Sequence, residues 1–224
     1  MLKKVVTAVA AACALVTFGP AQAALHARNL VGDAAPEAYY DDLLNITWLA
    51  NASAPGFVTW QAAVAWVAQF EIGGISGWRL PKHVDVGNDG CNLSWIAGPG
   101  GTDCGLNVDV RTGELAHLYH VTLGNISYPS PGWVQTNYGP FSNYYGRLPG
   151  GAEYWWYGDH YKFGDNAWTF KPAFGAQVFT VTSLASGAWA VRDGDVPQVP
   201  EPGTWALSLL GLASLGAVTR RRKA

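Results

Sequence analysis

Residues 73–81 read Gly-Gly-Ile-Ser-Gly-Trp-Arg-Leu-Pro, and they separate the clearest helix of the chain from a loop rich in aspartate and asparagine. The first two glycines end the helix, because glycine readily takes the left-handed conformation found just past a helix C-terminus. The last five residues of the stretch, 77–81, predict a short strand that the proline stops. This stretch therefore marks a change from helix to strand.

The helix before this stretch is predicted over residues 59–70. Trp60, Ala63, Val64 and Val67 fall at positions i, i+3, i+4 and i+7, which places them on one helical face. Thr59 precedes them and is a suitable N-cap, because its hydroxyl can accept a hydrogen bond from the first turn.

A second helix is predicted to begin near Thr112 and to stop at Gly124. Strand-like sequences rich in β-branched and aromatic residues occur at 41–50, 167–171, 176–182 and 188–192. The apolar residues of the second helix share one face, and they are Leu115, Leu118 and Tyr119, with Thr122 beside them. The order of elements predicts an α+β domain rather than a series of βαβ units.

Two arginines lie inside apolar, strand-like segments. A charge in such a place needs a partner, so we expect Arg79 and Arg192 to pair with acids. Asp193, Asp195 and the acids of the 85–109 loop are the candidates. Both arginines are therefore predicted to have structural roles.

The N-terminus has the form of a secretory signal peptide. Lys3 and Lys4 precede an apolar stretch at 5–18, and Ala-Gln-Ala at 21–23 supplies a small-x-small cleavage site. We therefore predict that residues 1–23 are a signal peptide, cut after Ala23 by a signal peptidase.

The C-terminus has three parts: a Pro-Glu-Pro triplet, an uncharged apolar run at 203–219 and a basic tail at 220–224. The apolar run is at the short end of what spans a bilayer. The tail would stay in the cytoplasm under the positive-inside rule. This order resembles the PEP-CTERM sorting signal of Gram-negative bacteria. The residues that carry the resemblance are Pro200, Glu201, Pro202, Arg220, Arg221 and Arg222.

The PEP-CTERM resemblance implies recognition by an exosortase, a membrane peptidase that cuts near the triplet. The protein would cross the inner membrane, be held there transiently by residues 203–219, and finish at the cell surface or outside the cell. Residues 24–195 would be the exported domain, and 196–202 a linker with the sorting triplet.

The exported part is acidic. Residues 24–200 hold 8 Lys and Arg against 15 Asp and Glu, a net charge of −7. This argues against nucleic-acid binding, because no basic surface is available to neutralise phosphates. Its length suits one domain with its own core.

Two cysteines remain once Cys13 leaves with the signal peptide. In an oxidising compartment, Cys91 and Cys104 are predicted to form a disulfide. Closing so short a loop stabilises the fold by roughly 3 kcal/mol at most.

A second resemblance spans roughly residues 40–195. Six segments resemble landmarks of the Lcl C-terminal domain family: 42–49 with its Leu-Asn-Ile-Thr-Trp-Leu core, 60–63, 73–81, 114–118, 153–155 and 189–195. The resemblance implies a C-type-lectin-like fold with two helices, a small antiparallel sheet and a long loop-rich region. It implies no reaction. Relatives usually follow Tyr-Trp with small hydroxyl residues, whereas this chain has Trp156-Tyr157.

The sequence around the two cysteines is rich in side chains with oxygen atoms that could bind a metal ion. The acidic ones are Asp85, Asp89, Asp103 and Asp109. Such ligands suit calcium, but aspartate in loops mostly caps turns, so no cofactor is predicted and calcium is the alternative. Glu114, His117 and His120 lie at positions i, i+3 and i+6 of the second helix, so the outer two side chains point in different directions. Asp159 and His160 are a further pair of candidate metal ligands. None of these patterns makes a metal motif by itself.

Aromatic residues are concentrated between positions 133 and 170, where 13 of 38 residues are Trp, Tyr or Phe. Adjacent residues of a strand point to opposite faces, so only one of Trp155 and Trp156 is expected to face the core. Exposed rings can stack on sugars or anchor a protein partner. Tyr145, Trp156 and Tyr157 are the predicted ligand-binding residues, and an aromatic-rich core is the alternative.

The leading hypothesis is a non-enzymatic surface or matrix protein that binds an extracellular glycan or a surface protein. Motifs for a serine nucleophile, a phosphate loop or a His-Glu-x-x-His zinc site are absent from the sequence. One alternative is an enzyme distantly related to formylglycine-generating enzymes, which need a reactive cysteine pair. The other is a purely structural matrix protein.

Overall fold

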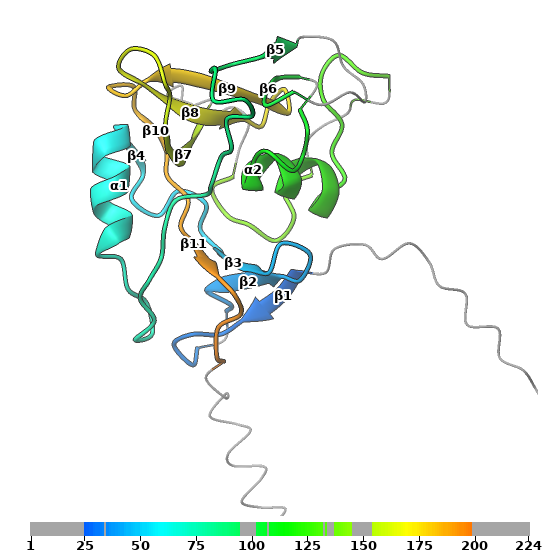
Figure 1. Cartoon of the computed structure of the whole chain (residues 1–224). Helices are drawn as coiled ribbons and strands as arrows, with labels where there is room; N and C mark the ends of the chain where they lie inside the picture. The colour runs from blue at the N-terminus through cyan, green and yellow to red at the C-terminus, as the bar shows by residue number, and fades with distance from the viewer. Residues whose placement is uncertain are drawn as a thin grey trace, which may run out of the picture.

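A computed structural model describes residues 25–33, 35–94, 102–106, 108–131, 133, 137–144 and 154–198. Within these ranges the chain forms two sheets, an α-helix and a short helix that continues as a π-helix. Figure 1 shows the smaller sheet below the larger one, with the first helix at one side. The predicted signal peptide and the predicted sorting tail lie outside the described residues.

The smaller sheet joins the two ends of the described chain. Its order is β1-β2-β3-β11, and every neighbouring pair is antiparallel. The strands are β1 (Leu25–Arg28), β2 (Ala38–Asp41), β3 (Ile46–Leu49) and β11 (Val191–Asp193). The strand predicted at 41–50 is therefore shorter, because residues 42–45 form the turn between β2 and β3.

The larger sheet has the order β4-β10-β7-β8-β9-β6-β5. Its centre is an antiparallel meander of β7 (Trp155–His160), β8 (Asn166–Lys171) and β9 (Ala176–Val181). Short strands extend it on both sides, namely β4 (Phe57–Val58), β10 (Ser186–Gly187), β6 (Cys104–Gly105) and β5 (Leu93–Ser94). Two pairs, β10 with β7 and β5 with β6, are parallel.

The predicted helices are present with modified ends. Helix α1 covers Trp60–Ala68, and the Thr59 hydroxyl accepts a hydrogen bond from the Ala62 N–H at 3.4 Å. The second helix is α2 (Glu114–His117), which runs directly into the π-helix η1 (Leu118–Thr122). Gly73, in the turn after α1, has a φ of 58°, and a Cβ there would overlap the carbonyl of Leu30.

A chain of aromatic rings forms the centre of one core that spans both sheets. Trp48 of β3 lies 5.0 Å from Trp189, which lies 4.8 Å from Tyr144, which in turn lies 5.5 Å from Trp155 of β7. The indole N–H groups of Trp189 and Trp155 donate to backbone carbonyls at 2.7 and 3.0 Å. These bonds satisfy polar groups that would otherwise be costly to bury.

Two sequence-based expectations about strands are wrong. Residues 77–81 do not form a strand, because only Arg79 pairs there, through an isolated bridge to Val191. The sheet content exceeds the small antiparallel sheet that we expected, since short edge strands far apart in sequence join the meander. The relationship to C-type lectins stays a prediction.

Candidate functional site

The two predicted binding residues on β7 are buried. Trp156 and Tyr157 have no exposed surface. The Trp156 indole donates to the Val58 carbonyl at 2.9 Å, and the Tyr157 hydroxyl donates to Gln177 at 2.6 Å. Burial raises the pKa of the Tyr157 hydroxyl well above its usual range. The exposure predicted for these residues is therefore wrong, and Tyr145 lies outside the described residues.

Both faces of β7 are covered, so neighbouring rings on this strand are buried together. Trp155 and Trp156 point to opposite sides of the strand, as alternation requires, yet neither is exposed. The expectation that only one of them would be buried assumed a single covered face, and it is wrong.

Exposed aromatic rings lie elsewhere on the larger sheet and its loops. Tyr128 and Trp133 are exposed, and the Tyr128 ring lies 5.1 Å from Trp133 and 5.5 Å from Phe174. On β9, Phe179 is 39% exposed and stacks on Tyr161 at 4.0 Å. Tyr128, Phe174 and Phe179 fall outside the 133–170 window that the sequence singled out, and only the fold brings them near it.

A cavity of about 470 Å³, which we call the aromatic cavity, lies beside two of these rings, Phe174 and Phe179. Its wall contains the disulfide and two small apolar residues of β9, Ala176 and Val178. Tyr154, Phe174 and Phe179 also line it. Its size is in the range of small-molecule sites, which are mostly apolar with a few polar groups.

Lys171 supplies the positive charge of the aromatic cavity. Its ammonium lies 4.6 Å from the centre of the Phe174 ring and 5.1 Å from that of Tyr154. A cation over a ring face is attracted by the ring quadrupole, so these contacts hold the ammonium at the cavity. The aromatic cavity therefore combines stacking surfaces with one cation.

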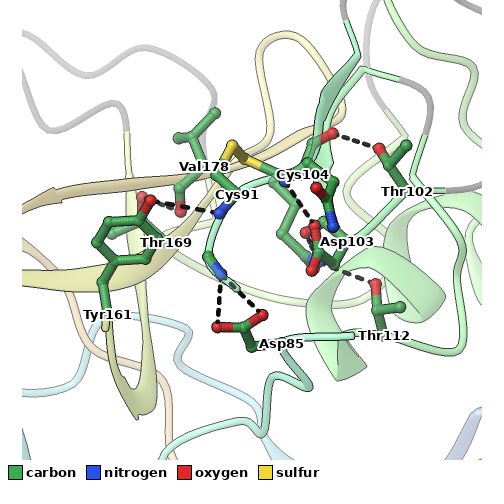
Figure 2. Close-up of a disulfide and its surroundings, with 12 residues drawn as sticks. Asp85, Cys91, Thr102, Asp103, Cys104, Thr112, Tyr161, Thr169 and Val178 are labelled. Carbon is green, nitrogen blue, oxygen red and sulfur yellow. Dashed lines mark hydrogen bonds between the residues drawn. A yellow bond between two sulfur atoms is a disulfide. The ribbon is translucent and has the colours of Figure 1, made fainter. Parts of the chain in front are cut away.

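Cys91 and Cys104 form the expected disulfide, with their Cα atoms 5.2 Å apart. Figure 2 shows the carboxylates around it, which accept backbone hydrogen bonds. Asp85 accepts from the Gly90 N–H with both oxygens at 3.2 Å, and Asp103 accepts from Val86 at 3.0 Å and from Asn92 at 3.1 Å. These bonds shape the loop next to the aromatic cavity.

The four candidate calcium ligands do not converge. Asp89 accepts from the Asn92 amide at 3.1 Å, and Asp109 pairs with Arg111 at 2.6 Å. Burial raises the pKa of Asp103, against the effect of its backbone hydrogen bonds. In the part of the chain that the structure describes, no group of three or more His, Cys, Asp or Glu side chains could hold a metal ion. These aspartates serve as turn and loop acceptors.

The helical trio of Glu114, His117 and His120 separates in the structure. Both His120 nitrogens lie near backbone carbonyls, at 3.2 Å from Asn125 and 3.1 Å from Gly175. Burial lowers the pKa of both histidines. Glu114 instead binds an arginine.

That arginine is Arg79, which forms the centre of an ion-pair network. It donates to the two Glu114 oxygens at 2.7 Å each and, through Nε, to Asp193 at 3.0 Å. The predicted pairing with Asp193 is confirmed. Glu114 was missed, although its position at the start of the predicted helix was visible in the sequence.

Arg192 does not form the predicted ion pair. Its Nε donates to the Ser76 carbonyl at 3.0 Å. Asp195, the other candidate partner, pairs with Arg28 of β1 at 2.6 Å. Arg28 lies in a strand that the sequence did not indicate, so this pair could not be anticipated.

The end of the chain provides the decisive comparison. Residues 198–223 match the PEP-CTERM protein-sorting motif. The motif includes the predicted recognition residues Pro200, Glu201, Pro202 and the arginines at 220–222. Comparison with curated proteins and with solved structures found no match.

The PEP-CTERM motif implies export, processing by an exosortase and targeting to the cell surface. Among the described residues, no helix has the length and apolar character needed to cross a membrane. The membrane segment predicted at 203–219 lies outside those residues.

Proposed function

We propose that the exported domain is a non-enzymatic module that binds an extracellular glycan at the aromatic cavity. The observation that carries this proposal is a cavity of about 470 Å³ that holds Lys171 and is lined by three aromatic rings, of which Phe179 is exposed. Sugar rings present apolar C–H faces that stack on aromatic side chains, while their hydroxyls use polar groups at the edge.

Lys171 favours a glycan that carries carboxylate or sulfate groups. The exported segment has a net charge of −7, so an anionic polymer would be repelled by most of its surface. A cation located at the cavity directs such a polymer to that place. Binding should therefore weaken as salt screens this attraction.

The closed disulfide supports a binding module over the enzyme alternative. Chemistry of the formylglycine-generating type needs a reactive cysteine pair, whereas Cys91 and Cys104 are bonded to each other. Thiol titration of the native protein should find no free thiol. Two free thiols together with copper affinity would favour the enzyme.

The test uses the mature protein, purified from secreting cells, on an array of neutral and acidic polysaccharides. Phe179→Ala should weaken binding to the best ligand about tenfold, the upper end for one aromatic contact. Phe57→Ala is the matched control, because Phe57 is 37% exposed and Phe179 is 39% exposed, but Phe57 lies on β4. Lys171→Met should weaken the binding of acidic polysaccharides and leave the binding of neutral ones unchanged.

Failure to bind any glycan would favour the purely structural alternative. Equal effects of Phe179→Ala and Phe57→Ala would show that the aromatic cavity is not the binding site. The folding of each variant is checked by thermal unfolding, because Phe179 also stacks on Tyr161.

A further inference from the structure

The chain between β11 and the PEP-CTERM motif stays bonded to the folded domain. We call residues 194–198 the stem. The Gly194 N–H donates to the Asn45 carbonyl at 2.8 Å, and the Gly194 carbonyl accepts from the Thr47 hydroxyl at 2.8 Å. The stem therefore begins as a continuation of β11 along β3.

An ion pair joins the stem to the first strand. Arg28 of β1 donates through Nε and Nη2 to the two carboxylate oxygens of Asp195, at 2.6 and 2.8 Å. The Arg28 side chain is only 13% exposed, whereas that of Asp195 is 47% exposed. Two parallel N–H···O bonds fix both the distance and the orientation of a carboxylate. Asp195 is therefore held at a defined place on β1.

Two further contacts follow the ion pair. Val196 is 3% exposed and belongs to the hydrophobic core. The Gln198 amide donates to the Ala27 carbonyl at 3.1 Å. Removing Val196 from the core would expose apolar surface to water, whereas the exposed Gln198 can exchange its hydrogen bond for one with water. The stem is therefore held more firmly at residues 194–196 than at its end.

The sorting triplet follows the stem almost at once. Only Val199 separates Gln198 from Pro200, and the apolar run begins at Gly203. Five residue steps of at most about 3.6 Å each join the Gln198 and Gly203 Cα atoms, so these atoms lie within about 18 Å of each other. A membrane peptidase that cuts near the triplet must work within this distance while the stem is bound.

The bound stem competes with a peptidase for the same residues. An extended peptide is recognised through main-chain hydrogen bonds along several residues, and the residues before the triplet are engaged by β1, β3 and the core. Cleavage of a folded substrate then proceeds through the fraction of molecules in which the segment has opened locally. Contacts that hold the stem reduce this fraction.

We propose that the stem limits exosortase processing of this protein, with Arg28 as the residue that sets how often the stem opens. Arg28 acts through Asp195 and is therefore a positioning residue. Processing is faster when the stem is released from β1. This inference uses no residue of the aromatic cavity, so it does not depend on glycan binding.

The test follows the full-length chain by pulse-chase in cells that contain the exosortase, with the precursor and the cleaved form separated by mass. Arg28→Met removes the ion pair and keeps Val196 in the core. Because the Asp195 side chain is about half exposed, the pair contributes modestly, and the processing rate should rise about two- to fivefold.

Arg111→Met is the matched control. Arg111 also binds a carboxylate through its guanidinium, that of Asp109, but it lies outside the stem and β1. This variant should be processed at the native rate.

A spacer variant tests whether access to the triplet is the limiting factor. Inserting Gly-Ser-Gly-Ser between Gln198 and Val199 supplies flexible chain beyond the stem contacts and keeps the triplet intact. This variant should be processed at least as fast as Arg28→Met. Adding Arg28→Met to the spacer should have no further effect, because the stem no longer has to open.

The variant Cys91→Ser/Cys104→Ser separates opening of the stem from general destabilisation, since it removes the disulfide without changing the stem. It should be processed at the native rate. If it is processed as fast as Arg28→Met, cleavage follows general unfolding and the proposal is overturned.

An unchanged or slower rate in Arg28→Met would also overturn the proposal. So would a spacer variant that is processed no faster than the native chain, or an effect of Arg28→Met that persists in the spacer variant. None of these outcomes bears on the glycan array.

Discussion

Arg79 is predicted to contribute more to stability than any exposed ion pair of this protein. Its guanidinium holds Glu114 with two hydrogen bonds of 2.7 Å, and the two side chains are only 22% and 16% exposed. Replacing it by methionine leaves the Glu114 carboxylate desolvated without its cation. Breaking a buried pair in this way costs about 3–5 kcal/mol. The residual exposure places our expectation near the lower value, about 3 kcal/mol.

The assay is urea unfolding at pH 7 with the disulfide intact, followed by tryptophan fluorescence. Arg111→Met is the matched control, because Arg111 also binds a carboxylate through its guanidinium, that of Asp109, but its side chain is 86% exposed. This variant should unfold at the same urea concentration as the native protein, since exposed ion pairs contribute little to stability.

A double variant, Arg79→Met with Glu114→Gln, extends the test. Removing the unpaired carboxylate should restore part of the lost stability, because its desolvation is then no longer a cost. If Arg79→Met unfolds at the same urea concentration as Arg111→Met, the network does not stabilise the fold and the reasoning is refuted.

Three further predictions concern buried groups. His83 has a pKa of about 4 in the folded protein and an ordinary value of 6.5, so the unfolded chain takes up a proton at a higher pH than the folded protein does. The free energy of unfolding should therefore be level above pH 6.5 and fall as the pH drops toward 4. Between pH 7 and pH 4.5 the native protein should lose about 2 kcal/mol more of its free energy of unfolding than His83→Gln does, as measured by urea unfolding. Reduction of the Cys91–Cys104 disulfide should lower stability by up to about 3 kcal/mol, measured with and without reductant. Trp156→Ala should lower the free energy of unfolding by about 3–5 kcal/mol. Trp133→Ala should leave the midpoint of thermal unfolding unchanged.

Each of these has a contrary result. Parallel pH profiles of the native protein and His83→Gln would mean that the histidine is not held neutral. A Cys91→Ser/Cys104→Ser variant should not respond to reductant, and a response would show a nonspecific effect. Equal destabilisation by the two tryptophan variants would contradict the burial of Trp156.

Local patterns predicted the local structure well. The apolar spacing from Trp60 to Val67 located α1, and Thr59 caps it as expected. Arg79 required an acid because of its apolar neighbours, and Asp193 was among the few candidates. Such features depend on neighbours in sequence or on one obligatory charge pair, which a single sequence displays.

Features that depend on the packing of distant segments could not be predicted. Whether Trp156 faces solvent depends on what covers the second face of β7, and the residue pattern of β7 does not contain this information. The aromatic cavity likewise needs Phe179 of β9 to lie beside the Cys91–Cys104 disulfide. The hydrogen bond from the His83 N–H to Asp159 of β7 likewise joins segments that only the tertiary fold brings together.

The position of β11 has a mechanical consequence. β11 is the last strand before the PEP-CTERM motif, and beyond it Arg28 holds Asp195 while the Gln198 amide donates to the Ala27 carbonyl at 3.1 Å. A pull on the tail reaches these contacts before it reaches the backbone hydrogen bonds between β11 and β3. These contacts therefore lie where the PEP-CTERM motif joins the domain, while β8 and β9 lie at the opposite end of the domain (Figure 1). A load applied through the tail would therefore act on the smaller sheet first.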